Sequence, residues 1–279
     1  MKNIIKGVLV VYRPAPRCLE IVKCIMPKLR EAGLFVNSMW VDDLVKELKI
    51  KTDLVISVGG DGTLLKISRI FQDISPLILP IPCGRRTVLY EDIDPLQIDT
   101  VIEKLLNGEF TIQLLDRIRI HYENSDYHAL NEIALISVDR GRVVGFDIHI
   151  NTLSTVSKYH IEGDGLIIGP STGSAAYNLS ARGPLIDYGL EAIFITPINP
   201  MELNISPIIV PPLSKIVIET RGFTEVYIDG EKTDILGSGK KIYIELSHTH
   251  LRLIRLKDKK NYVSDVFEKR RVKFNPCEV

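Results

Sequence analysis

Apolar residues follow two different patterns along the chain. Over roughly the first 110 residues, short apolar runs alternate with segments whose apolar side chains recur every three or four positions. The runs predict strands at residues 6–12, 34–40, 53–58 and 76–82, and the helical spacing predicts helices at 19–29, 42–48 and 63–71. Alternating strands and helices are typical of a parallel sheet with helices on both faces.

From about residue 110, the helical spacing gives way to short strand-like segments separated by turn residues. Helical character returns only at residues 172–181 and in the tail, at 263–271. The second half of the chain is therefore predicted to be all-β. Its predicted strands are residues 117–122, 128–137, 145–150, 157–160, 193–196, 215–220, 225–229, 241–246 and 251–256.

The run 53–58 ends in Gly59-Gly60-Asp61-Gly62, and a predicted helix follows directly. A helix N-terminus offers free N–H groups to a phosphate, and Gly60 and Gly62 would let the backbone approach it closely. A carboxylate such as Asp61 repels phosphate unless it holds a cation or accepts a proton from a nucleophile, which favours phosphoryl transfer. The alternative is a tight turn in which Asp61 caps the helix.

A second loop of this design begins at Asp164, which lies between two glycines. An apolar strand and a turn of small residues follow, where Thr172, Ser174 and Ala175 would present hydroxyl and N–H groups to an anion or a base. Tyr177 would supply a flat face for adenine. N-capping of a helix by this turn is compatible with that function.

Two further polar features lie in the β-rich half. Asn131-Glu132 is embedded in a predicted apolar strand, where buried polar groups need partners. The pair either binds a ribose or a base edge, or is a structural pair at a strand end. Asp229-Gly230 is read as a hairpin turn.

The composition, 45% hydrophobic and 25% charged, is that of a globular protein. Because 35 Lys and Arg balance 35 Asp and Glu, we expect no nucleic-acid partner. The apolar region 205–218 is interrupted by prolines and no signal peptide is visible, so we expect no membrane association. The four cysteines show no CxxC pair, which predicts reduced thiols in a cytoplasmic protein.

Taken in order, these motifs resemble the NAD kinase family. Residues 59–63 resemble its GGDG(T) loop, and Asn131-Glu132 resembles its NE motif. Residues 164–167 and 170–177 are similar to its DGLIV…PTGSTAY segment, residues 196–200 to its TPI.P segment, and Asp229-Gly230 to a further DG. Lipid kinases and phosphofructokinases share the GGDG loop, so the long second segment is the discriminating match.

The resemblance implies a kinase that phosphorylates the 2′-hydroxyl of the adenosine ribose of NAD to give NADP. ATP or polyphosphate would be the donor, with Mg²⁺ or another divalent metal. It also implies a Rossmann-like α/β domain at 1–112, a β-rich, sandwich-like NAD-binding domain at 113–258, a segment at 259–279 that packs back on the first domain, and a homodimer or homotetramer.

Residue roles follow from the same resemblance. Asp61 would be catalytic, Gly60 and Gly62 would shape the phosphate loop, and Asp164 would bind the nicotinamide side. Asn131 and Glu132 would hold NAD by hydrogen bonds. Thr172, Ser174, Ala175, Ala176, Tyr177 and Ser180 are predicted to line the adenine and ribose pocket. Arg85 and Arg86 are predicted binding residues because of their charge and not because of the resemblance.

The chain departs from the family pattern mainly at residues 81–89, where the family has Asn-x-Gly-x-x-Gly-Phe-Leu. Pro82 replaces the Asn, Thr87 the second Gly and Val88 the Phe. Arg85 and Arg86 add positive charge that either meets phosphates or stays solvated. Two rival hypotheses are a lipid kinase, for which no amphipathic membrane helix is found, and an NAD(P)-binding sensor without turnover.

Overall fold

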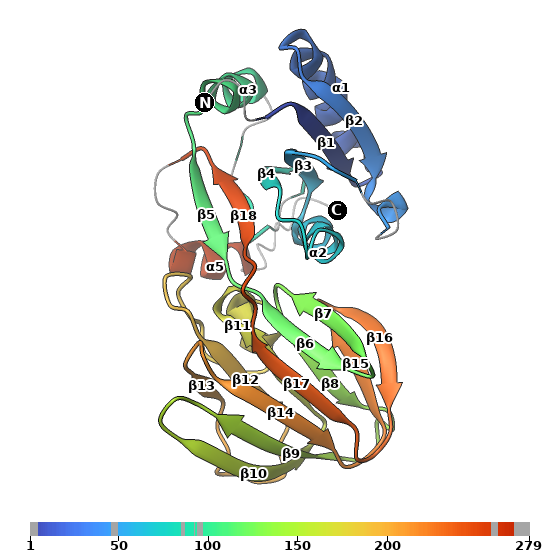
Figure 1. Cartoon of the computed structure of the whole chain (residues 1–279), viewed down its shortest axis with the longest axis vertical. Helices are drawn as coiled ribbons and strands as arrows, with labels where there is room; N and C mark the ends of the chain where they lie inside the picture. Colours follow the sequence, from blue (N-terminus) through green and yellow to red (C-terminus); the bar gives the residue numbers. More distant parts are fainter. Residues whose placement is uncertain are drawn as a thin grey trace, which may run out of the picture. The chain divides into compact units, whose positions relative to one another are not determined.

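The computed structural model describes residues 5–45, 50–84, 87–91, 93, 97–257 and 262–270. The chain divides into two compact units, which we describe separately. Unit 1 comprises residues 1–67, 76–113 and 253–279, and unit 2 comprises residues 68–75 and 114–252. Figure 1 shows the elements of both along the chain.

A six-stranded sheet with the order β2-β1-β3-β4-β18-β5 forms the centre of unit 1. Strands β1 to β4 pair in parallel. The strands are β1 Gly7–Tyr12, β2 Phe35–Trp40, β3 Leu54–Gly59, β4 Leu77–Pro82, β5 Thr111–Leu115 and β18 Leu251–Arg255. The helices are α1 Pro16–Glu31, α2 Asp61–Ile70, α3 Ile98–Asn107 and α5 Tyr262–Arg270, with a 3₁₀ turn at Val41–Asp43.

The parallel α/β arrangement predicted from the sequence is confirmed. Strands β3 and β4 are buried at every position, which explains why they read as continuous apolar runs. Helix α1 packs on the sheet with the side of the helix that carries Ile21, Ile25 and Leu29. Prolines mark the starts of two of these elements, with Pro16 in the first turn of α1 and Pro76 directly before β4.

Three details of unit 1 differ from the prediction. Helix α3 was missed, and the helix predicted at 42–48 is a 3₁₀ turn at Val41–Asp43, with residues 46–49 outside the described part of the chain. The strand predicted at 251–256 does form, but it lies in the first sheet, between β4 and β5. An amphipathic or apolar pattern reports the local conformation and not the sheet that a strand joins.

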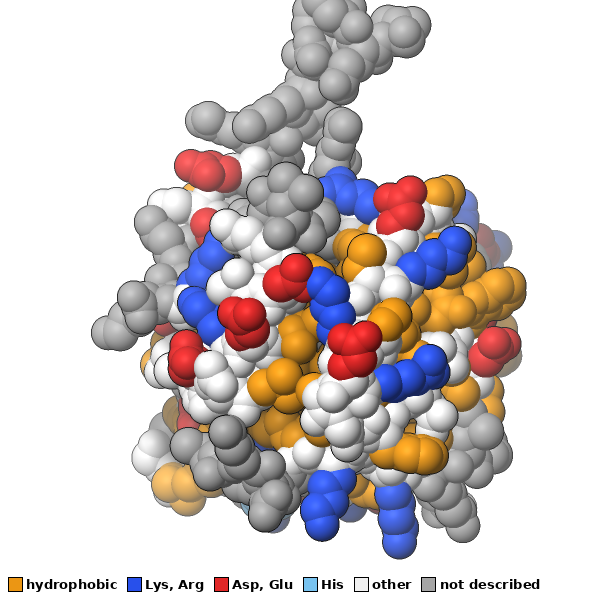
Figure 2. All heavy atoms as spheres, turned by 90° about the horizontal axis from the view of Figure 1, so that it is seen from above, with side chains coloured by type: hydrophobic (Ala, Val, Ile, Leu, Met, Phe, Trp, Pro, Cys, Tyr) orange, Lys and Arg blue, Asp and Glu red, His pale blue; other side chains and the backbone are white. Residues whose placement is uncertain are grey.

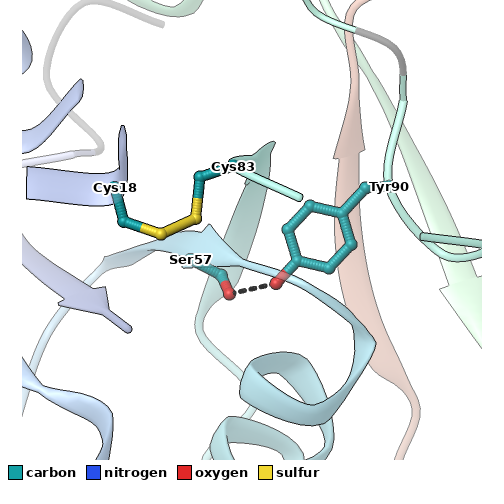
Figure 3. The surroundings of a disulfide bond; sticks show 4 residues. All are labelled: Cys18, Ser57, Cys83 and Tyr90. Carbon is teal, nitrogen blue, oxygen red and sulfur yellow. Dashed lines mark hydrogen bonds between the residues drawn. A yellow bond between two sulfur atoms is a disulfide. The ribbon is translucent and has the colours of Figure 1, made fainter. Parts of the chain in front are cut away.

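The prediction of reduced cysteines is wrong for two of the four. Cys18 in α1 and Cys83 directly after β4 form a disulfide, with 5.2 Å between their Cα atoms (Figure 3). The two residues are separated by 65 positions, so no local spacing could reveal the pair. The parallel sheet brings the end of β4 next to the first turn of α1. Cys24 is a free, exposed thiol, and Cys277 lies outside the described residues.

Unit 2 is a sandwich of two six-stranded sheets, with the orders β10-β9-β14-β17-β6-β7 and β13-β12-β11-β8-β15-β16. Buried side chains from both sheets form one core, including Ile120, Phe146, Leu135 and Ile168. The predicted β-rich second half is therefore confirmed as a β-sandwich. Its strands are β6 Ile118–Tyr122, β7 Ser125–Ala129, β8 Ile133–Ser137, β9 Val144–Asn151, β10 Val156–Gly163, β11 Gly165–Pro170, β12 Ile193–Ile198, β13 Ile208–Val210, β14 Lys215–Thr220, β15 Thr224–Ile228, β16 Glu231–Leu236 and β17 Lys241–Leu246.

The predicted helix start at 172–181 is a 3₁₀ helix, η4 Ser171–Ala175, followed by one turn of α-helix, α4 Tyr177–Ser180. The single strand predicted at 128–137 is in fact two strands, β7 and β8. Asn131 and Glu132 lie in the connection between them and are not embedded in a strand. They lie where the chain passes from the sheet that contains β7 to the sheet that contains β8.

Arg117 explains why residues 68–75 group with unit 2. Its guanidinium is fully buried and donates hydrogen bonds to the carbonyl oxygens of Ser68, Gln72 and Thr249 and to the hydroxyls of Ser75 and Thr249. Burial lowers the pKa of Arg117 to about 10, so the group stays charged at neutral pH. One buried cation thus fixes the segment after Ile67 to the sandwich.

On the face drawn in Figure 2, the described Lys and Arg side chains are interspersed with Asp and Glu, and apolar side chains lie between them. Among the described residues, no helix combines the length and the apolar character needed to cross a membrane.

We expect loss of the disulfide to destabilise unit 1. Cys18→Ser should lower the free energy of unfolding by about 2–4 kcal/mol, because a crosslink over a long loop restricts the unfolded chain. Urea unfolding under oxidising conditions measures this loss, and reduction should lower the wild-type stability to that of the variant. Cys24→Ser, at an exposed thiol, is the control and should change little. A wild type with the same stability before and after reduction, and no gain of two thiols on reduction, would contradict the pairing.

Candidate functional site

The glycine loop of unit 1 joins the end of β3 to the start of α2. A Cβ at Gly59 would lie 2.3 Å from Thr63 Oγ1, so only glycine fits there. A Cβ at Gly62 would meet nothing within 4 Å, and one at Gly60 only Thr87 Cγ2, at 3.5 Å. The backbone of Gly60 and Gly62 is therefore open on the side where a ligand would approach.

Asp61 is the first residue of α2, and its carboxylate is held by the backbone of another segment. Its Oδ2 accepts the N–H of Val88 at 2.9 Å, and its Oδ1 accepts the N–H of Leu89 at 3.1 Å. These two bonds fix the orientation of the carboxylate at the N-terminus of α2. The sequence suggested a role for Asp61 but gave no sign of these partners, which lie 27 and 28 positions further along the chain.

Tyr90 lies beneath this loop and anchors it. Its hydroxyl is 2.6 Å from the Ser57 hydroxyl, and both side chains are fully buried (Figure 3). Burial raises the pKa of Tyr90, and the Asp61 charge adds to that rise while Ser57 opposes it. Tyr90 therefore stays neutral and ties residues 88–90 to strand β3. Arg85 and Arg86, two predicted binding residues, lie outside the described part of the chain.

In unit 2, the Asp229 carboxylate holds the loop that carries Asn131 and Glu132. Its Oδ2 accepts the N–H of Leu130 at 3.0 Å, and its Oδ1 accepts those of Asn131 and Glu132 at 2.7 and 3.3 Å. The predicted hairpin turn is confirmed, because Asp229 and Gly230 link β15 to β16 with φ values of 50° and 80°. The role of the Asp229 side chain was missed; its match to the family DG was the only signal.

Glu132 is a buried carboxyl beside the buried Asp229. Its side chain accepts the backbone N–H of Tyr177, and its Oε2 has no hydrogen-bond partner within the described residues. Burial, and then the charge of Asp229, raises the pKa of Glu132 to about 8. Burial raises the pKa of Asp229 to about 6, against the three N–H groups that favour its ionised form. At neutral pH, Glu132 is thus mainly a neutral acid that can donate a hydrogen bond to a ligand.

The turn 171–175 packs directly on the same loop. A Cβ at Gly173 would lie 1.7 Å from the carbonyl oxygen of Asn131, and one at Gly169 would lie 2.2 Å from that atom. Glycine is required at both positions because the two backbones are in contact. The structure therefore brings together the Asn131-Glu132 pair and the Ser171–Ala175 turn, which are distant in the sequence.

The predicted binding residues of this turn differ in exposure. Thr172, Ser174 and Ala175 are buried, and the Ser174 hydroxyl makes both of its hydrogen bonds with the backbone of Ile186. Tyr177 is 42% exposed, Ser180 is exposed and Ala176 is half-buried, so these three present surface to a ligand. Ser174 therefore supports the turn from beneath.

Asp164 and Asn178 complete the surroundings. Asp164 is exposed and accepts a hydrogen bond of 2.8 Å from the Asn199 side chain. Asn178 was not singled out from the sequence. Its buried amide donates to the carbonyl oxygens of Ser174 and Pro184 and accepts the Thr196 hydroxyl at 2.6 Å. Thr196 begins the TPI segment, so that motif supports the turn through Asn178.

The comparisons with known proteins cover both units. Residues 18–110 match the family model of the ATP-NAD kinase N-terminal domain, and residues 130–256 match that of the C-terminal domain. The chain belongs to the NAD kinase family, a family of phosphotransferases. It is 33% identical over 229 residues to the NAD kinase of Thermococcus sibiricus, and the match covers 78% of each chain. It is 30% identical over 248 residues to the NAD kinase of Caldicellulosiruptor bescii, and the match covers 88% of this chain and 92% of the relative.

Two solved structures share the fold. One is an NAD kinase from Archaeoglobus fulgidus in complex with ATP, with a TM-score of 0.77, 25% identity and coverage of 94% of this chain and 98% of that one. The other is yeast NADH kinase complexed with NADH, with a TM-score of 0.83, 23% identity and coverage of 95% and 87%. The second likeness concerns the fold alone.

We expect Glu132→Gln to change the pH dependence of stability. The unfolded carboxyl loses its proton near pH 4.5, whereas the folded one keeps it to about pH 8. The folded state therefore binds the extra proton, and stability falls as the pH rises through this window, by up to about 1.4 kcal/mol per pH unit. Urea unfolding from pH 5 to 8.5 should show a shallower decline for the variant. Glu103→Gln, at an exposed carboxyl, is the control; parallel curves for wild type and Glu132→Gln would contradict the assignment.

Gly173→Ala should separate the two backbones that form this site. Its Cβ would overlap the Asn131 carbonyl oxygen, so the loop or the turn must move. We expect a lower unfolding temperature and weaker NAD binding, measured by scanning calorimetry and titration calorimetry. Gly141→Ala, whose Cβ would meet no atom closer than 3.7 Å, is the matched control. Unchanged NAD affinity in the folded Gly173→Ala variant would show that this contact does not shape the site.

Proposed function

We propose that this protein transfers the terminal phosphoryl group of ATP to the 2′-hydroxyl of the adenosine ribose of NAD, giving NADP. The observation that carries the proposal is the Asp61 carboxylate, fixed by the N–H groups of Val88 and Leu89 at a glycine-lined helix N-terminus. Phosphoryl transfer needs little covalent help, and positioning with charge neutralisation supplies most of the catalysis. Membership of the NAD kinase family over both units supports the same reaction.

The proposed roles follow the residues described above. Asp61 accepts the proton of the attacking 2′-hydroxyl, and the backbone of Gly60 and Gly62 approaches the phosphates. Asn131 and the neutral Glu132 bind NAD by hydrogen bonds, and Asp164 lies on the nicotinamide side. Tyr177, Ala176 and Ser180 line the adenine and ribose, while Thr172, Ser174 and Ala175 form the buried base of that turn.

The residues present fit a divalent cation delivered with the nucleotide. Mg²⁺ keeps several waters and binds through nucleotide phosphates and one or two carboxylates, and Asp61 is the carboxylate of the glycine loop. The cation would neutralise charge on the transferring phosphoryl group. The N–H groups of Val88 and Leu89 would continue to orient the Asp61 carboxylate. Asp61 would also remain the proton acceptor.

The proposal extends to the phosphoryl donor, the assembly and the compartment. The Archaeoglobus fulgidus relative was crystallised with ATP, which favours ATP over polyphosphate as the donor. A homodimer or homotetramer is supported by apolar side chains left exposed on the strands of unit 2, such as Val156, Ile209 and Tyr243. We place the protein in the cytoplasm, where NAD and ATP are available.

Asp61→Asn should keep NAD binding and lose most of the turnover. The Asn amide cannot accept the hydroxyl proton. Its NH₂ group, which replaces one carboxylate oxygen, cannot accept a hydrogen bond from the N–H of Val88 or Leu89. We expect kcat to fall by about 10²- to 10⁴-fold, with the NAD dissociation constant little changed in calorimetry. Asp42→Asn, at an exposed carboxylate of unit 1, is the control. Unchanged turnover in Asp61→Asn would remove this residue from the mechanism.

NADP formation from NAD, ATP and Mg²⁺ tests the function itself, with polyphosphate in a parallel reaction and an NADP-specific dehydrogenase as the readout. Product that requires the metal establishes the kinase and identifies its donor. Calorimetric binding of NAD or NADP without product from either donor would favour the sensor hypothesis. Attention would then turn to residues 81–89, where the chain departs from the family pattern.

A further inference from the structure

Three metal-ligating side chains of unit 2 meet outside the regions discussed so far. Asp116 lies between β5 and β6, Glu191 two residues before β12, and His250 directly before β18. One ligand atom from each lies within 4.8 Å of the other two. Two ligand atoms of a single cation are about 3–4 Å apart when each bond is about 2.0–2.2 Å long. Small side-chain movements would therefore bring the three ligand atoms to the spacing that a cation requires.

Asp116 is the unusual member of this group. It is 7% exposed, and its Oδ1 lies 3.4 Å from His250 Nε2. That distance is longer than an ordinary hydrogen bond. Buried carboxylates ordinarily accept several hydrogen bonds or bind a cation. Among the described residues, the contact with His250 therefore offsets only part of the desolvation of this carboxylate.

The charges around Asp116 act on its pKa in opposite directions. Burial raises the pKa of Asp116, the Glu191 carboxylate raises it further, and His250 opposes both. Arg117 is adjacent in the sequence, but its guanidinium is used by residues 68–75 and by Thr249. Two carboxylates and an imidazole thus converge in this part of unit 2.

We propose that Asp116, Glu191 and His250 form a site for a divalent transition-metal cation of the zinc or manganese type. One imidazole nitrogen with two carboxylate oxygens favours such ions over Mg²⁺ and Ca²⁺, which prefer oxygen ligands alone. Three protein ligands leave room for water in the remaining positions. This site is separate from the metal that accompanies ATP and does not depend on the proposed reaction.

The cation would stabilise the support of the turn 171–175. Leu190, next to Glu191, accepts the Ser171 hydroxyl through its carbonyl oxygen, and Ile186 makes two hydrogen bonds with Ser174. Binding Glu191 would fix the segment that carries these contacts. It would also join Asp116 and His250, which lie within two residues of the ends of the long segment of unit 2, 114–252.

Metal binding to the full-length protein, stripped with a chelator and free of nucleotide, tests the proposal. Mn²⁺ is titrated with the free ion followed by electron paramagnetic resonance, and Zn²⁺ is titrated by calorimetry. We expect Glu191→Gln and Asp116→Asn to bind one ion fewer than the wild type, or to bind it at least about tenfold more weakly. Glu191 is exposed, so its variant should fold even where Asp116→Asn does not.

Two controls make the result specific. His121→Gln removes an exposed histidine that also lies beside an aspartate, Asp126, at 3.0 Å, and should leave metal binding unchanged. In the wild type, the metal should slow amide hydrogen exchange in residues 185–191, and this effect should be absent in Glu191→Gln. Equal affinity and stoichiometry in the wild type and Glu191→Gln, or no binding by either, would overturn the proposal.

Discussion

The contact between the Asp229 carboxylate and three successive N–H groups, those of Leu130, Asn131 and Glu132, organises the proposed ligand-binding side of unit 2. Hydrogen bonds to a charged group contribute about 1.5–3 kcal/mol each, and a buried carboxylate without them would not stay ionised. The contact holds the backbone where the chain passes from β7 in one sheet to β8 in the other. It thereby fixes the connection in which Asn131 and Glu132 lie and the surface on which the turn 171–175 packs.

The two units use the same physical device. In unit 1 the Asp61 carboxylate accepts N–H groups of Val88 and Leu89, and in unit 2 Asp229 accepts those of the 130–132 loop. In each case a side chain at a turn fixes the backbone of a distant segment. Salt bridges to long, mobile side chains would define these positions less sharply, because they carry a larger entropic cost. The difference lies in solvation: Asp61 is half-buried, whereas Asp229 is buried and raises the pKa of its neighbour Glu132.

Close backbone approaches explain why the motifs are rich in glycine. Gly173 and Gly169 touch the Asn131 carbonyl, and Gly59 touches Thr63, so any side chain at these positions would displace a neighbour. Gly60 and Gly62 have open space and are suited to a ligand. Glycines in one motif thus serve packing of the protein on itself and, in the proposed reaction, access for phosphate. The buried Ser174 shows the same division, since its hydroxyl holds Ile186 while exposed Tyr177 faces outward.

The sequence by itself determined the parallel α/β half, the β-rich half, the glycine loop with Asp61 and the membership of the NAD kinase family. These follow from local periodicity and from motifs whose residues are neighbours in the chain. Only the tertiary structure decided the Cys18–Cys83 pair, the place of β18 in the first sheet, the Asp229 contact and the meeting of Asp116, Glu191 and His250. Each of these joins residues far apart in the sequence, and local pattern carries no information about which distant segments the folded chain brings into contact.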